Sequence, residues 1–171
     1  PIGTINVTLN NTGGLVTATI PAETVFTSTV DDVSYQFVTI AEHTTNISNG
    51  QLIFSSIPIY EGTYTKNRYT VDTKNVDQKF KITSDRADTT TLTVQVFSSA
   101  DSSTFDTYTL ATDITQVGPT SEVYFLQECD DGRFEVYFGD GIIGKALSDN
   151  NVVVLSYVVT NKQEANGATT F

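Results

Sequence analysis

Short runs in which apolar and polar residues alternate recur along the chain. Two clear examples are Ile5 to Leu9 and Leu92 to Val96, where every second residue is apolar. A period of two places the apolar side chains on one face of a strand, so both runs predict half-buried β-strands. The segment from Val152 to Val159 is almost continuously apolar and predicts a strand that is buried on both faces.

Turn-forming residues separate the predicted strands. Asp31 and Asp32 lie between two β-rich runs at residues 24–30 and 33–40, and this spacing predicts a hairpin. Asp131-Gly132 predicts a second tight turn, because both central positions of such a turn favour residues that accept a positive φ. The C-terminal third of the chain therefore reads as a β-meander.

Two segments lack clear alternation. Residues 41–50 and 65–78 are polar and mixed, so we expect loops there, and the best helix candidate is one turn at residues 145–150. The predicted class is all-β, with antiparallel sheets in a sandwich-like or two-lobed arrangement and little or no helix. We expect an N-terminal β lobe over residues 1–111 and a C-terminal meander over residues 112–171, or one continuous domain.

Composition supports strands and limits the possible partners. The 171 residues include 29 Thr, 8 Tyr and 10 Phe, which fit a pleated, half-buried surface. The net charge of −11 disfavours direct contact with nucleic acid or with an anionic membrane surface. The chain contains no Met and begins at Pro1, so we interpret it as a fragment of a longer protein.

Residues with catalytic or metal-binding chemistry form no convincing group. Cys129 and His43 are far apart in the sequence, and nothing places them together as a nucleophile and its base. Asp130, Asp131 and Asp140 do not have the spacing of a calcium loop, and Asp131 and Asp140 fit better as turn formers. We therefore expect no enzymatic activity, no cofactor, no metal ion and no small-molecule substrate.

The segment Gly139-Asp140-Gly141-Ile142-Ile143-Gly144 has the spacing of a dinucleotide-binding loop. That motif binds phosphate only where it joins a strand to a helix. Here the next strand is expected at Val152, which leaves no room for a helix. The segment therefore predicts a sharp glycine-dependent bend, and the residues that we expect to build this bend are Phe138, Gly139, Asp140, Gly141, Gly144 and Lys145.

This bend also carries a resemblance to a known family. The run from Arg133 to Lys145 resembles the signature of the baseplate wedge proteins of contractile-tailed bacteriophages, the baseplate J-like family that includes a large wedge subunit. Further segments resemble that family in the same order along the chain. They are Ile20 to Phe26, Tyr35 to Phe37, Tyr60 to Gly62, Glu122 to Leu126, and the closing Ala165-Asn166-Gly167 before Phe171. Glu23 stands where the family usually has Gly.

The resemblance implies a central, β-rich fragment of a wedge subunit with a structural role. Its expected partners are other baseplate wedge and tail proteins and copies of its own parent chain. Its expected location is the tail baseplate of the virion, assembled in the host cytoplasm. The alternative is a tail-associated receptor- or carbohydrate-binding β module, for which Tyr60, Tyr64 and Tyr69 are the candidate aromatic patch.

Overall fold

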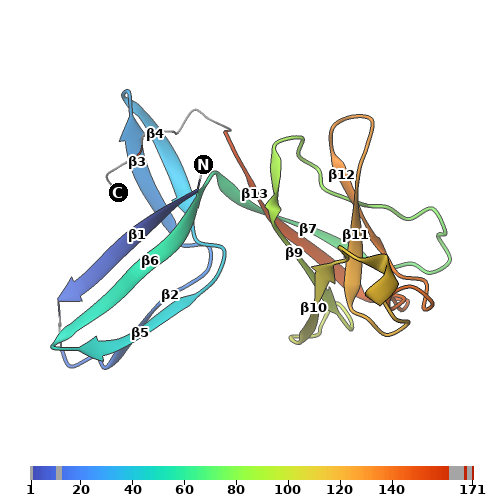
Figure 1. The fold of residues 1–171 in the computed structure, drawn as a ribbon, viewed down its shortest axis with the longest axis horizontal. Helices are drawn as coiled ribbons and strands as arrows, with labels where there is room; N and C mark the ends of the chain where they lie inside the picture. Colours follow the sequence, from blue (N-terminus) through green and yellow to red (C-terminus); the bar gives the residue numbers. More distant parts are fainter. Residues whose placement is uncertain (1, 11–12, 162–167, 169–170) are drawn as a thin grey trace. The chain divides into compact units, whose positions relative to one another are not determined.

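The computed structural model describes residues 2–10, 13–161, 168 and 171, and the described chain is built almost entirely of strands (Figure 1). The predicted all-β class is confirmed. The chain forms two compact units, one from residues 1–64 and 158–171 and the other from residues 65–157. The division expected from the sequence, between residues 111 and 112, lies inside the second unit.

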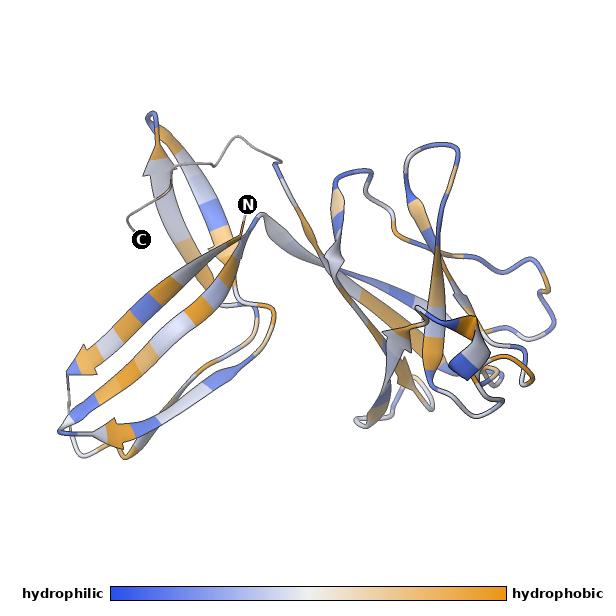
Figure 2. Ribbon diagram, in the orientation of Figure 1, coloured by the Kyte–Doolittle hydropathy of each residue, from blue (hydrophilic) through white to orange (hydrophobic). Residues whose placement is uncertain are grey.

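The first unit contains one antiparallel sheet. Its strands are β1 (Ile2–Asn10), β2 (Thr17–Ile20), β3 (Val25–Val30), β4 (Val33–Val38), β5 (His43–Ser48) and β6 (Gln51–Glu61). The strand order is β2-β5-β6-β4-β3. Strand β1 lies outside this order and pairs with β6. Apolar and polar bands alternate along β1 and β6, which is the pattern of strands with one buried face (Figure 2).

The β3–β4 hairpin forms as the sequence predicts. Val30 pairs with Val33, and the two residues between them, Asp31 and Asp32, have φ angles of 49° and 63°. Two left-handed residues give the turn a twist that matches the twist of the flanking strands. The hairpin carries Phe37 into the core of the unit, where the buried residues are Ile5, Phe37, Phe54, Ile57 and Ile59.

The second unit contains a seven-stranded sheet and a short 3₁₀ turn. Its strands are β7 (Thr63–Thr70), β8 (Phe80–Lys81), β9 (Ala87–Phe97), β10 (Phe105–Leu110), β11 (Val123–Glu128), β12 (Phe134–Phe138) and β13 (Val152–Val159), and the turn is η1 (Ile114–Gln116). The order is β7-β13-β9-β10-β11-β12-β8. The β10–β11 pair is parallel, so this sheet is mixed, whereas the sequence predicted antiparallel pairing throughout.

Side chains link the two edge strands of this sheet, so that it is nearly closed, like a barrel. The Tyr69 hydroxyl of β7 donates a hydrogen bond of 2.6 Å to the carbonyl oxygen of Lys81 in β8. The side-chain amide of Asn67 in β7 donates a 3.3 Å hydrogen bond to the hydroxyl of Thr83, just beyond β8. The Asn67 Oδ1 accepts a 2.6 Å bond from the Tyr157 hydroxyl. Covering an edge in this way leaves fewer unpaired backbone groups for unwanted pairing.

The segment of β13 predicted to be buried on both faces is buried as expected. Val152, Val153, Leu155, Tyr157 and Val158 each have a relative exposure of 0%. The strand is second in the sheet order, between β7 and β9, so both of its edges are paired. This combination explains why its sequence shows no alternation.

Three sequence predictions about local structure are wrong. Residues 43–48 form β5 and residues 63–70 form β7, where loops were expected at 41–50 and 65–78. The inward-facing positions of both strands include His, Thr, Asn and Tyr. Because these residues are polar, the sequence does not show the alternation of apolar and polar residues that marks a strand. The single helical turn lies at residues 114–116 and not at 145–150, because the Asp113 carboxylate accepts a 2.9 Å bond from the Thr115 amide. In the described ranges there is no helix of the length and apolar character that a bilayer span requires.

Candidate functional site

The glycine-containing bend predicted from the sequence follows β12 and leads toward β13. Phe138, the last residue of β12, anchors the start of the bend in an aromatic cluster. Its ring lies edge-on to Phe80, with ring centroids 5.2 Å apart, and to Tyr108 at 5.5 Å. Edge-to-face aromatic contacts at these distances are favourable beyond the area they bury, so the first residue of the bend is held in place.

Gly139 and Gly144 bring the two ends of the bend into close contact. A Cβ atom added at Gly139 would lie 2.2 Å from the carbonyl carbon of Gly144 and 2.3 Å from its oxygen. No side chain fits in that space, so position 139 is restricted to glycine by direct steric exclusion. Gly139 also forms an isolated parallel bridge with Ala146, which closes the base of the bend.

The tip of the bend is fixed by hydrogen bonds within the loop. Gly141 has a φ of 87°, and its amide donates a 3.0 Å bond to the carbonyl oxygen of Gly144. The Asp140 Oδ1 accepts bonds from the amides of Ile142, at 2.9 Å, and Ile143, at 3.0 Å. These amide donors, that of Ile143 first, hold the pKa of Asp140 below its usual value. A charged Asp140 therefore stabilises the tip at neutral pH.

Backbone bonds attach the bend to the irregular segment that precedes β11. The Gly144 amide donates to the carbonyl oxygen of Gly118 at 3.1 Å, and the Lys145 amide donates to that of Ser121 at 2.8 Å. Both acceptors lie outside any strand. The bend is thus bonded to a second loop as well as to its own strand, and we expect it to behave as a rigid part of the unit.

The Lys145 side chain adds an ionic link to neighbouring strands. Its Nζ lies 2.7 Å from Oε1 of Glu122 and 3.2 Å from Oδ2 of Asp106 in β10. The two carboxylates, Glu122 first, raise the pKa of Lys145 above its ordinary value. All three side chains are partly exposed, so each pair contributes at most about 1 kcal/mol. Their main effect is to fix where the end of the bend lies.

Two apolar side chains project from this rigid frame into solvent. Ile142 has a relative exposure of 74% and Ile143 one of 42%. An exposed isoleucine pair is unfavourable in an isolated domain, whereas a pre-ordered apolar tip loses little conformational entropy when it is buried by another protein. The bend therefore presents a pre-ordered apolar tip to solvent.

A hollow of about 490 Å³ lies beside the bend, between it and the segment that follows β7. Its lining is mainly apolar and amide in character, and its two charged residues are Asp72 and Asp140. Neither carboxylate has a neighbouring base or cation in this lining. The hollow thus extends the contact surface of the bend and does not assemble a reactive group.

The other residues considered for chemistry belong to different units, have an unfavourable pKa or form hydrogen bonds within turns. His43 lies in the first unit and Cys129 in the second. Burial, followed by the nearby Glu135 carboxylate, raises the pKa of the Cys129 thiol, and this disfavours the reactive thiolate. The Asp131 carboxylate accepts a bond from the Arg133 amide in its turn. Across the described ranges, no group of three or more His, Cys, Asp or Glu residues is arranged to hold a metal ion.

The three tyrosines of the alternative binding patch do not all belong to one unit. Tyr60 lies in the first unit and Tyr69 in the second, while Tyr64 lies in β7 directly before the boundary between the units. The Tyr69 ring packs edge-on against Phe80 with centroids 5.7 Å apart, and its hydroxyl bonds to the backbone of β8. Tyr69 thus contributes to the closure of the barrel-like sheet.

Sequence reasoning identified the bend but not what surrounds it. The bend is supported by backbone bonds and ion pairs from four residues outside it, Gly118, Ser121, Glu122 and Asp106. Their spacing from the bend in the sequence follows no motif, so the sequence could not predict these contacts. Sequence reasoning made no prediction about the exposure of Ile142 and Ile143, because two apolar residues between glycines show no period from which burial can be inferred. The closing Ala165-Asn166-Gly167 motif lies outside the described residues.

Fold and site together define an all-β protein with a rigid, apolar-tipped loop suited to protein contacts. Comparison with known proteins adds one relative. The chain is 35% identical over 69 residues to baseplate wedge protein gp6 of Enterobacteria phage T4, a match that covers 32% of this chain and 10% of that protein. The chain thus spans about a tenth of the length of the curated relative that it matches. No family model matches the chain. The local similarity relates the chain to phage baseplate proteins.

Proposed function

We propose that this chain is a structural domain of a contractile-tail baseplate wedge, where it contributes to assembly through protein–protein contacts. The observation that carries the proposal is the local similarity to a phage baseplate wedge protein. The proposed partners are other wedge and tail proteins and further copies of the parent chain, and the proposed location is the virion tail after assembly in the host cytoplasm. The proposed role requires no catalysis and no cofactor.

The geometry of the bend supports a role in contacts. In the proposed role the domain would move between its neighbours as a rigid body. The bend from Phe138 to Lys145 fits this role because it is fixed by steric closure, backbone bonds and ion pairs. Its exposed tip, Ile142 and Ile143, would bury apolar area against a neighbour at little entropic cost. We propose that this tip is one of the wedge contacts.

The test is affinity capture with the tagged chain from a lysate of cells infected by the phage that encodes it, with the captured proteins identified by mass spectrometry. Recovery of baseplate and tail proteins, and loss of at least one of them with the Ile142→Asp/Ile143→Asp variant, is the expected result. The matched control is Leu110→Asp/Ile114→Asp, which adds the same two charges at exposed apolar positions of the same unit that do not line the hollow. Binding to a glycan array without recovery of tail proteins would instead establish the receptor-binding alternative.

A further inference from the structure

Strand β1 leaves one long backbone edge without a partner in the described part of the chain. Its inner edge pairs with β6 from Ile2 opposite Tyr60 to Asn10 opposite Gln51. In the described ranges no other strand pairs with β1. In an antiparallel pair, every second residue of an edge strand directs its N–H and C=O away from its neighbour. The outer edge of β1 therefore presents a row of donors and acceptors for a further strand.

The sequence of β1 contains none of the usual protections of an edge strand. Soluble proteins commonly guard an edge with Lys, with Pro or with a bulge that turns it away. The segment Ile2-Gly3-Thr4-Ile5-Asn6-Val7-Thr8-Leu9-Asn10 contains no charged residue and no Pro. The register shift between Ile5 and Val7 places its extra residue in β6, where Ser56 has a φ of 54°. The outer edge of β1 therefore continues through the bulge.

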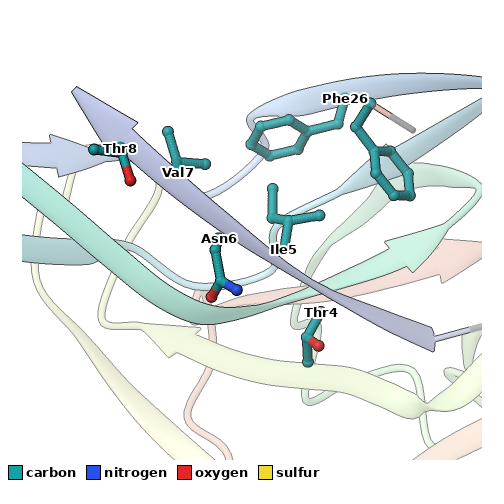
Figure 3. A pocket seen from close by; sticks show the side chains of 7 residues that line it. Thr4, Ile5, Asn6, Val7, Thr8 and Phe26 are labelled. Carbon is teal, nitrogen blue, oxygen red and sulfur yellow. The ribbon is translucent and has the colours of Figure 1, made fainter. Parts of the chain in front are cut away.

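A hollow of about 660 Å³ follows this strand, lined by Thr4 to Thr8 of β1 together with Phe26 and Phe171. Figure 3 shows that Ile5 and Val7 lie on the same side of β1 as the Phe26 ring. Five consecutive strand residues and two aromatic rings form a channel along the strand. Such a channel suits apolar side chains at alternate positions of an added strand.

The charge of the first unit indicates the chemistry of the added strand. Residues 1–64 contain five acidic residues, Glu23, Asp31, Asp32, Glu42 and Glu61, and no Lys or Arg, and residues 158–171 add Glu164 and Lys162, so the net charge of the unit stays negative. A segment with Lys or Arg at its polar positions is attracted to this unit, whereas a second copy, with a net charge of −11, is repelled. Charge complementarity thus favours a basic partner over self-association.

We propose that the outer edge of β1 binds an extended, basic segment of a partner protein by strand addition. The segment lies beside β1, forms backbone hydrogen bonds with it and places apolar side chains in the hollow beside Phe26. This is the recognition mode in which main-chain bonds supply affinity and pockets for alternate side chains supply specificity. The inference is independent of the proposed baseplate role, because it rests on the edge of β1, the hollow beside it and the charge of the first unit.

The test begins with peptides of about twelve residues selected from a random displayed library against the purified chain. The selected peptides are expected to alternate apolar residues with residues that include Lys or Arg. Val7→Lys places a cation in the hollow and is expected to raise their Kd at least tenfold. Val33→Lys, at a half-exposed position of β4 that does not line the hollow, is expected to bind as the unmodified chain does.

Amide hydrogen exchange of the unmodified chain keeps the proposal testable even if Val7→Lys fails to fold. Bound peptide is expected to slow exchange at alternate residues of β1. Selected peptides that protect other strands, that are acidic, or that bind both lysine variants equally would overturn the proposal. So would a failure to select any peptide, or a concentration-dependent dimer that the Val7→Lys variant abolishes, since the latter would make a second copy the occupant.

Discussion

At the scale of single residues, glycines in the bend are required for two different reasons. Gly139 is limited by space, because its Cβ would overlap the backbone of Gly144. Gly141 is limited by its φ of 87°, while the nearest atom to its Cβ would be the Ala146 Cβ at 3.8 Å. Steric overlap with backbone is relieved only by moving the chain, whereas a left-handed conformation costs an L-residue about 1–2 kcal/mol.

Substitutions at these two positions should therefore differ. We expect Gly141→Asn to lower the free energy of unfolding by less than about 1 kcal/mol, since Asn tolerates the left-handed region. Gly141→Val should cost about 2 kcal/mol or more, because a β-branched residue does not. Gly139→Ala should cost more than Gly141→Asn, despite its smaller side chain. Chemical denaturation measures all three values, and equal costs for Gly139→Ala and Gly141→Asn would contradict the distinction.

Glu23 shows the same backbone requirement at a position without glycine. Its φ is 68°, and its amide donates a 2.8 Å bond to the carbonyl oxygen of Thr39. The family that the sequence resembles usually has Gly at this point, and the turn here keeps a backbone that glycine favours. Glu23 thus adopts a left-handed conformation at a position where the sequence resemblance predicts Gly.

Glu23→Gly is expected to raise the free energy of unfolding by about 0.5–1 kcal/mol, because relief of left-handed strain exceeds the added entropy of the unfolded chain. Glu23→Ala is the control, since alanine keeps the strain and removes the same carboxylate. Thermal and denaturant unfolding of both variants provides the measurement. A gain in stability with alanine equal to that with glycine would assign the effect to the lost charge instead.

At the scale of elements, a buried carboxylate links β8 to β12. Glu135 has an exposure of 2%, and its side chain accepts a 2.5 Å bond from the Tyr137 hydroxyl. Lys79 and Lys81 pair with the same carboxylate at 3.2 Å and 3.4 Å. The Tyr137 hydroxyl first, and then Lys79, hold the pKa of Glu135 below its ordinary value. The charged form of Glu135 is thus part of the folded structure.

The sign of the resulting pH dependence follows from this lowered pKa. A carboxyl group with a lower pKa in the folded state stabilises the fold above its unfolded pKa of roughly 4 and loses this effect as pH falls through the folded value. We expect the free energy of unfolding to fall between roughly pH 5 and pH 2, and Glu135→Gln to reduce that fall. Glu128→Gln, at an exposed position of the paired strand β11, is the control. If the free energy of unfolding depends on pH in the same way for Glu135→Gln and for the unmodified chain, the Glu135 carboxyl is not the cause of the acid destabilisation.

At the scale of the whole molecule, the two units differ in how the chain builds them. The second unit uses one continuous segment, residues 65–157, whereas the first requires residues 158–171 to return to residues 1–64. Within the first unit, the buried carboxylate of Glu61 accepts bonds from the backbone amide of Asn161, at 3.0 Å, and from its side-chain amide, at 2.8 Å. Removing the returning segment leaves this buried carboxylate without those two donors.

We therefore expect the fragment 65–157 to fold alone and the fragment 1–64 to need the returning segment. Dispersed amide resonances and a cooperative unfolding transition would show folding of fragment 65–157. Fragment 1–64 is expected to unfold at a lower denaturant concentration than the first unit within the intact chain. When Glu61→Gln is made in both proteins, the difference between their unfolding midpoints should become smaller. A fragment 1–64 as stable as the intact unit would show that the return contributes nothing to it.

The sequence alone determined the fold class, the buried strand at Val152–Val159, the Asp31-Asp32 hairpin and the position of the glycine bend. These features depend on local pattern, since side-chain period and turn chemistry act over a few residues. It could not determine β5 and β7, because polar residues at their inward positions conceal the alternation of apolar and polar side chains. Tertiary structure alone decided which segments make up each of the two units, the parallel β10–β11 pair, the supports of the bend and the open edge of β1. Each of these depends on which segments meet in space, and a single sequence carries no local signal for such pairings.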